Sequence, residues 1–187
     1  PVSVCHRVAP SATAPPTGRK TFAEGGYTVV REQRAGHRLA LLLDHGPLGY
    51  LAIAAHGHAD ALALMVTLDG APLFVDPGTY LYHAGGAWRD WFRGTRAHNT
   101  LNIALENQSL ITGPFNWSRK AQAWLESVQE GAAWSITAAH DGYRKPFGVI
   151  HRRCLFATAD GFAVRDQLET HKRVKPPHPV EIGWQLA

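Results

Sequence analysis

The chain has 187 residues, of which 45% are hydrophobic and 18% charged, and this length suits one domain with a sizeable core. Nineteen Lys and Arg residues against fifteen Asp and Glu residues give a formal charge of +4, which is compatible with an anionic partner; the basic residues are scattered, with no basic helix or RNA-binding motif, so nucleic acid is not an expected partner. No apolar run approaches the roughly 18 residues of a membrane span, and the two cysteines, Cys5 and Cys154, form neither a disulfide framework nor a Cys-based zinc site.

Residues 1–20 are rich in Pro, Ala, Ser and Thr without a sustained period, which predicts a linker or wrapping arm. The rest of the chain, 21–187, alternates short apolar runs with Gly and Pro turns, a pattern typical of an all-β protein. We expect an antiparallel β-sandwich that is part of a larger super-sandwich, with the chain ending inside a sheet. The expected strands are 26–32, 38–44, 61–68, 73–75, 99–104, 121–128, 133–140, 148–157, 161–167 and the beginning of one at 180–186.

The apolar run 51–55 leads directly into His56-Gly57-His58. Residues 61–68 form a longer apolar run in which Leu62, Leu64, Val66 and Leu68 alternate with other residues. A helix is possible over 59–66, but Asp69-Gly70 followed by the apolar run 73–75 is a hairpin signal and favours a strand. In an extended strand, residues two apart share a face, so His56 and His58 would project together and Asp60 would follow them.

Residues 77–96 form a connection that is too long and too aromatic to be passive. It contains Tyr80, Tyr82, Trp88, Trp91 and Phe92, so we expect an ordered, functional loop. One of the two alternating tyrosines can face a site while the other packs, and Tyr80 is the candidate for proton transfer.

Three residues of this region form the preferred metal-binding set: His58, Asp76 and His98. Two histidines and one carboxylate converging from separate segments are a common zinc set. The simpler alternatives stay open. The histidines of the His-x-His pair can be ordinary strand residues, Asp76 before Pro-Gly can merely organise a turn, and His98 with Asn99 can satisfy backbone groups at a strand end.

Four residues are candidates for substrate contacts: Arg89, Arg93, Trp88 and Asn99. The guanidinium groups can grip carboxylates or sulfates with paired hydrogen bonds, and the aromatic loop can stack on sugar rings. Solvated surface arginines are the alternative. The later segments His140–Tyr143 and His151–Arg153 are interpreted as structural or substrate-edge residues.

The blocks HGHAD, VDPGTY, RGTRAHNT, HDGY and HRR, in this order, resemble the heparinase II/III-like family of polysaccharide lyases over roughly residues 26–187. The resemblance implies a sandwich that in the parent protein pairs with an N-terminal helical toroid and cleaves acidic polysaccharide by β-elimination. It implies zinc, mainly structural, held by His58, Asp76 and His98, and a catalytic or substrate-contacting role for His56. It also implies a periplasmic or secreted location.

No toroid helix is present in the sequence, so the resemblance predicts a lyase half that is inactive alone. The alternative is a non-catalytic module that binds an acidic glycan. A cupin-like metal barrel is disfavoured, because cupins place a Glu three or four residues after the second histidine, where this chain has Ala61 and Leu62. P-loop, GxGxxG, GxSxG and HExxH motifs do not occur.

Overall fold

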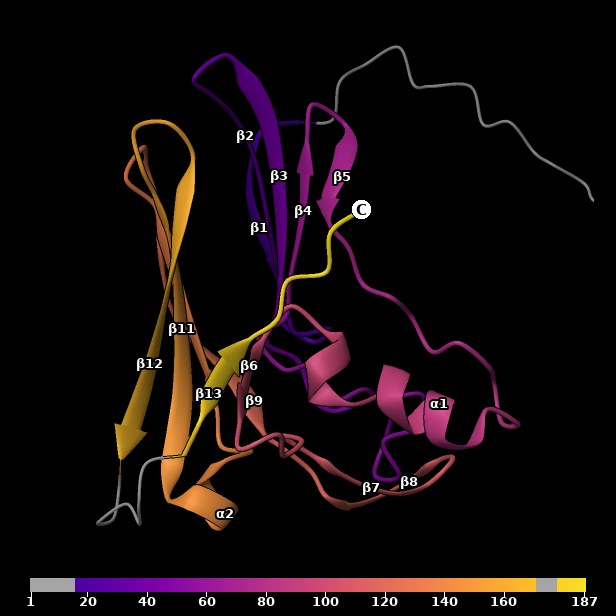
Figure 1. Ribbon diagram of the computed structural model, residues 1–187. Helices are drawn as coiled ribbons and strands as arrows, with labels where there is room; N and C mark the ends of the chain where they lie inside the picture. The colour runs from indigo at the N-terminus through magenta and orange to yellow at the C-terminus, as the bar shows by residue number, and fades with distance from the viewer. Residues whose placement is uncertain (1–15, 171–177) are drawn as a thin grey trace, which may run out of the picture.

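The computed structural model describes residues 16–170 and 178–187 and consists mainly of antiparallel strands, which confirms the all-β prediction (Figure 1). The strands are β1 Gly18–Phe22, β2 Tyr27–Arg34, β3 His37–Asp44, β4 Leu64–Leu68, β5 Ala71–Phe74, β6 Leu101–Ile103, β7 Leu110–Gly113, β8 Asn116–Arg119, β9 Ala123–Gln129, β10 Ser135–His140, β11 Val149–Ala157, β12 Phe162–Thr170 and β13 Val180–Ile182. The helices are α1 Gly86–Phe92, a 3-10 turn Thr95–Ala97 and α2 Arg144–Phe147.

Two larger sheets form the sandwich. One has the order β1-β2-β3-β4-β5 and the other the order β12-β11-β10-β9, and all neighbours are antiparallel. Short turns join most of the sequential neighbours, as in the hairpin at Asp69 and Gly70, where both residues have positive φ, whereas β3 and β4 are joined by the longer loop 45–63. Two small antiparallel pairs, β6 with β13 and β7 with β8, are separate from the two larger sheets, and β7 and β8 lie at the same end of the molecule as α1 (Figure 1).

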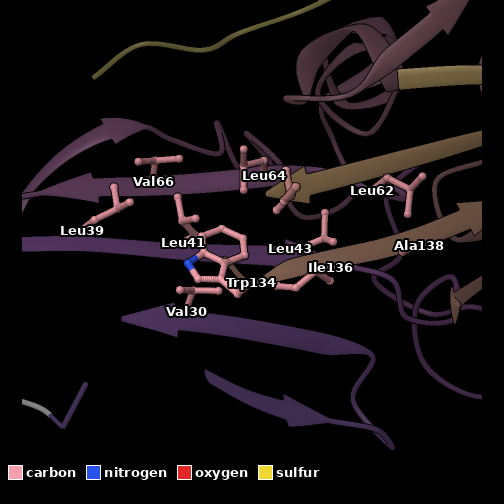
Figure 2. Packing of buried hydrophobic residues seen from close by; sticks show 11 residues of the cluster. Val30, Leu39, Leu41, Leu43, Leu62, Leu64, Val66, Trp134, Ile136 and Ala138 are labelled. Carbon is pink, nitrogen blue, oxygen red and sulfur yellow. The ribbon is translucent and has the colours of Figure 1, made fainter. Parts of the chain in front are cut away.

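The core lies between these sheets. The first sheet contributes alternate residues of β3 and β4, such as Leu41 and Leu64, and the second contributes Ile136 and Ala138 (Figure 2). Trp134 is fully buried between them and donates from Nε1 to the carboxylate of Glu32 across 3.0 Å. The period-two alternation read from the sequence therefore corresponds to one buried face on each sheet.

Several strand boundaries differ from the prediction. Residues 51–55 form turns, and β4 begins only at Leu64, because Leu51, Ala54 and Leu62 adopt positive φ values that interrupt an extended strand. The β7–β8 hairpin was not predicted, since its strands of four residues carry little alternation. The predicted arm 1–20 lies outside the described residues up to residue 15, and its last part, from Gly18, belongs to β1.

The last described segment continues past β13 along the edge of the first sheet. Val75 donates its backbone N–H to the carbonyl of Gln185 across 2.9 Å, and Phe74 and Leu186 form an antiparallel bridge. The expected strand at 180–186 is thus split into β13, which pairs with β6, and this edge segment.

A buried polar network on the second sheet supports the loops at the end of the sandwich. Arg153 is fully buried and forms a bidentate pair with Asp166, at 2.8 and 3.0 Å. Its remaining terminal nitrogen donates to the carbonyls of Leu62 and Asn99, at 2.8 and 2.7 Å. Arg153 therefore ties the second sheet to the two segments that lie beside His58 and His98.

Two buried histidines extend this network, and its donors fix their tautomers. The backbone N–H of Gly142 donates to His140 Nδ1, so His140 carries its proton on Nε2 and donates it to His151 Nδ1, 3.0 Å away. His151 Nε2–H then donates to Asp166 across 2.7 Å. Both rings are satisfied as neutral imidazoles, which is the structural interpretation of these residues.

These histidines make stability dependent on mildly acidic pH. Burial lowers the pKa of His151 and lowers that of His140 well below 6.5, so the unfolded chain binds protons more readily than the folded one. Stability is expected to fall as pH drops below about 6.5, by up to about 1.4 kcal/mol per pH unit for each such histidine. Urea unfolding at pH 7 and pH 5 measures this change, and equal free energies of unfolding at the two pH values would contradict it.

Candidate functional site

The loop that carries His56 and His58 joins β3 to β4. The prediction that the two side chains alternate on one strand is wrong, because His56 has a φ of 59° and the segment turns back on itself through a bridge between Tyr50 and Ala55. Gly49 permits this turn, since a Cβ there would lie 2.6 Å from the carbonyl oxygen of Ala54.

The structure brings His58, Asp76 and His98 together, with their candidate ligand atoms all within 4.8 Å of one another. His98 Nδ1 lies 2.6 Å from one oxygen of Asp76, and the rings of His58 and His98 are 5.1 Å apart between centroids. The turn interpretation of Asp76 also holds, since its other oxygen accepts the backbone N–H of Gly78 across 2.9 Å. Asp76 therefore orders its turn and contacts His98 at the same time.

Burial and neighbouring charges shift the pKa values of His58 and His98 in opposite directions. Burial, and then the charge of His98, lower the pKa of His58 to about 4, so its imidazole is neutral and has a free lone pair. Burial alone would lower the pKa of His98, but the Asp76 carboxylate outweighs this and raises it. His98 Nε2 is buried without a hydrogen-bond partner among the described residues. The donor set and this orphaned nitrogen fit a divalent cation.

His56 is exposed at the mouth of the site and stacks on Tyr82, with ring centroids 5.8 Å apart. Tyr80, the predicted proton-transfer tyrosine, is 58% exposed; its ring stacks on Phe92 and lies tilted beside Trp88. The catalytic roles of His56 and Tyr80 stay predictions. Tyr82 is the tyrosine beside His56, and its position two residues from Tyr80 was the only signal for it in the sequence.

The loop 77–96 is ordered by α1, and two of its three arginines, Arg89 and Arg93, are buried. Arg89 and Arg93 are 3% and 1% exposed and donate to backbone carbonyls of the β7–β8 hairpin, including that of Pro114, at 2.8 Å from each. Their use in substrate binding stays a prediction; the structure gives them the role of tying the loop to the hairpin. Trp88, in contrast, is 63% exposed and free to stack on a ligand.

The side chain of Asn99 satisfies backbone groups, as one of the two interpretations of this residue expects. Its amide nitrogen donates to the carbonyls of Leu64 and Val75, both at 2.9 Å, and its oxygen accepts the backbone N–H of Gln185. The side chain is 2% exposed and holds three segments in register beside His98. Its predicted contact with substrate stays a prediction.

A cleft of about 530 Å³ opens in front of His56 and His58 and also includes Asp44, Asp60 and Tyr50. Burial raises the pKa of Asp44 to about 7 and that of Asp60 to about 6, and the charge of Asp60 adds to the shift at Asp44. Asp44 was missed as a site residue. The signal for it was a carboxylate placed directly after the apolar run of β3.

An antiparallel sandwich with a His/Asp cluster and a cleft at one end defines a β-sandwich domain with a candidate metal centre. The family model of the heparinase II/III-like C-terminal domain matches residues 14–187. The chain therefore belongs to the heparinase II/III-like family and contains its C-terminal domain, which confirms the resemblance seen in the sequence.

Individual relatives agree with this assignment. The chain is 27% identical over 157 residues to a heparin-sulfate lyase of Bacteroides thetaiotaomicron, which covers 80% of the chain and 20% of that protein. It superposes on heparan sulfate lyase HepC from Pedobacter heparinus with a TM-score of 0.70 at 22% identity, over 94% of the chain and 25% of HepC. It superposes on a heparinase III structure with a TM-score of 0.67 at 25% identity, over 86% of the chain and 24% of heparinase III. The chain thus spans about a fifth to a quarter of the length of these relatives.

Proposed function

We propose that the chain is the metal-bearing half of a polysaccharide lyase that cleaves a uronic-acid-containing polysaccharide by β-elimination. The observation that carries the proposal is the cleft, in which the exposed His56 lies next to His58 of the His/Asp cluster in a domain of this family. The named relatives are lyases of heparin or heparan sulfate, which supports an acidic polysaccharide as the substrate class.

Elimination requires a base that takes the proton next to the uronate carboxyl group and an acid that protonates the departing glycosidic oxygen. An exposed imidazole at the cleft mouth suits one of these transfers, and a tyrosine hydroxyl suits the other. In the proposal His56 performs the histidine step. Tyr80 remains the predicted tyrosine, and Tyr82 is the one that the geometry places against His56.

The proposed cation is zinc, held by His58, Asp76 and His98. Bound there, zinc would supply a fixed positive charge and rigidity. The chain's own residues connect this cluster to the catalytic region, because Asp76 begins the loop that carries Tyr80 and Tyr82, and its contact with His98 fixes the start of that loop. The role of the cluster is therefore mainly to position the loop.

The function is tested by His56→Ala in the parent protein, which joins this domain to its remaining part. Turnover, followed by the absorbance of the unsaturated uronate product, is expected to fall at least about 100-fold, while binding of the polysaccharide is retained. The matched control is His37→Ala, an exposed histidine at the β2–β3 turn. Full turnover by the His56 variant would refute the catalytic role.

The second candidate function is a binding module for an acidic glycan. The observation in its favour is an exposed aromatic surface, in which Tyr80 stacks on Phe92 and lies beside Trp88. Under this alternative, Trp88→Ala weakens glycan binding whereas His56→Ala leaves the parent's activity unchanged. Turnover by the parent that depends on His56 would exclude it.

The 187-residue chain alone is expected to bind acidic polysaccharide weakly and to show no lyase turnover. The proposed partner that completes the cleft is the helical toroid domain of the parent protein, and the proposed location is periplasmic or secreted. The same absorbance assay on the purified chain measures this, with the parent protein as the positive control. Release of unsaturated uronate by the chain alone at the parent's rate would contradict it.

A further inference from the structure

A second pocket, of about 670 Å³, lies between the end of β8 and α2, away from the His/Asp cluster. Four basic residues and one acidic residue line it, together with two glycines: Arg119, Lys120, Arg144, Lys145, Asp141, Gly142 and Gly148. The basic residues come from two separate segments of the chain. The fold, and not a run of basic sequence, therefore gathers them.

Several other arginines of the described chain are paired with carboxylates, whereas the four basic residues of this pocket are not. Such pairs are Arg19 with Glu130, Arg34 with Glu32, Arg96 with Glu181, Arg152 with Glu126 and Glu169, and Arg153 with Asp166. Within residues 16–170 and 178–187, Lys120, Arg144 and Lys145 form no ion pair, and Arg144 and Lys145 are exposed. The positive charges of this pocket are therefore not offset by ion pairs within the described residues.

The other two basic residues are held in place by uncharged groups. Arg119 donates to the carbonyl of Asn107 across 3.0 Å, and its Nε is buried without a hydrogen-bond partner in the described parts of the chain. Lys120 donates from Nζ to the carbonyl of Ala52. Both side chains are thus positioned by backbone carbonyls, and neither forms an ion pair with a carboxylate of the described residues.

The single carboxylate of the pocket does not neutralise it. One oxygen of Asp141 accepts the backbone N–H of Gln122 across 2.8 Å, which fixes it to the strand end. Gly142 and Gly148 have no side chains, and Gly148 adopts a φ of 71° at the end of α2, so this wall stays open. Four positive charges against one negative charge leave an anion-attracting pocket.

We propose that this pocket is an accessory subsite for the carboxylate or sulfate groups of an acidic glycan. The contact of Lys120 with Ala52 joins the pocket to the loop that leads to His56, so a chain that extends from the candidate cleft can reach both. No aromatic side chain lines the pocket, whereas sites for single-stranded nucleic acid stack bases on aromatic rings. The choice of an acidic glycan as the ligand rests on the proposed function, whereas the expected affinity of the pocket for anions does not depend on that function.

The test compares charge-neutral variants of the 187-residue chain. Arg144→Gln with Lys145→Gln removes two charges from the pocket, and Arg31→Gln with Arg165→Gln removes two exposed charges from strands β2 and β12 as the matched control. Binding is measured by calorimetry with a heparin oligosaccharide, an oligogalacturonate, a neutral dextran and single-stranded DNA. The first probe presents sulfate and carboxylate, the second carboxylate alone.

The pocket variant is expected to bind at least one acidic oligosaccharide about tenfold more weakly than the wild type, with the control within about twofold. Arg144→Glu with Lys145→Glu is expected to weaken it further. Loss for heparin alone assigns sulfate, and loss for both assigns carboxylate. Equal weakening in the control, no acidic oligosaccharide binding by the wild type, or equally pocket-dependent DNA binding would overturn the proposal. Loss of turnover in the His56 variant is independent of these outcomes, so the two proposals fail separately.

Discussion

Replacing Asp166 with Ala is expected to lower the free energy of unfolding by about 3–5 kcal/mol. The carboxylate is 8% exposed and accepts hydrogen bonds from Arg153 and His151, whose side chains are fully buried. Its removal leaves a buried guanidinium without a counter-charge and a buried imidazole N–H without an acceptor. Urea unfolding followed by tryptophan fluorescence measures the change, and Asp160→Ala, at an exposed position in the β11–β12 turn, is the matched control.

The bidentate contact between Arg153 and Asp166 also predicts how the two single substitutions combine. Arg153→Met with Asp166→Ala removes both charges, so the loss in stability is expected to be smaller than the sum of the two single losses. Single losses that simply add would show that the two side chains act independently, against the bidentate contact.

The ion pair between Arg153 and Asp166 is lost at low pH. Arg153 and His151 stabilise the carboxylate and hold the pKa of Asp166 at about 2, against 3.8 for a free Asp. A depressed folded pKa means that the ion pair contributes fully above pH 3.8 and is lost as pH falls toward 2. The Asp166→Ala penalty is therefore expected to be unchanged between pH 7 and pH 5 and to shrink below about pH 4.

Replacing His58 with Ala is expected to weaken zinc binding by more than about 100-fold. His58 is one of three ligands in the candidate centre and offers a neutral imidazole at neutral pH, so no other described side chain of the cluster replaces it. Calorimetry of the purified chain with zinc and elemental analysis of the metal content measure the effect. The matched control is His83→Ala, an exposed histidine on the loop between β5 and α1.

His98→Ala is expected to weaken zinc binding to the same extent and also to lower the stability of the fold. The His98 ring is fully buried, and its removal leaves Asp76 without its hydrogen-bond partner. The difference between the two variants separates ligation from packing. A wild-type chain that takes up no zinc, or a His58 variant that binds zinc as tightly as the wild type, would remove the candidate metal centre.

Much of the fold was accessible from residue patterns alone. Most strands of the two large sheets, though not β1, follow from local alternation and Gly turns, as in β3 with Leu39, Leu41 and Leu43 buried in turn. The family blocks placed His58, Asp76 and His98 in one set, and the structure brings their ligand atoms together. These are properties of short segments, and short segments can be recognised without knowing what they pack against.

The sequence by itself thus determined the class of fold, the family and the set of candidate ligands. Only the tertiary structure decided how each polar residue is used. The arginines Arg89 and Arg93 turn inward to backbone carbonyls, Asn99 holds three segments, and Arg144 with Arg119 meets in a basic pocket. Exposure and partners of a side chain depend on segments distant in the sequence, and residue identity alone does not encode which of those segments will be adjacent.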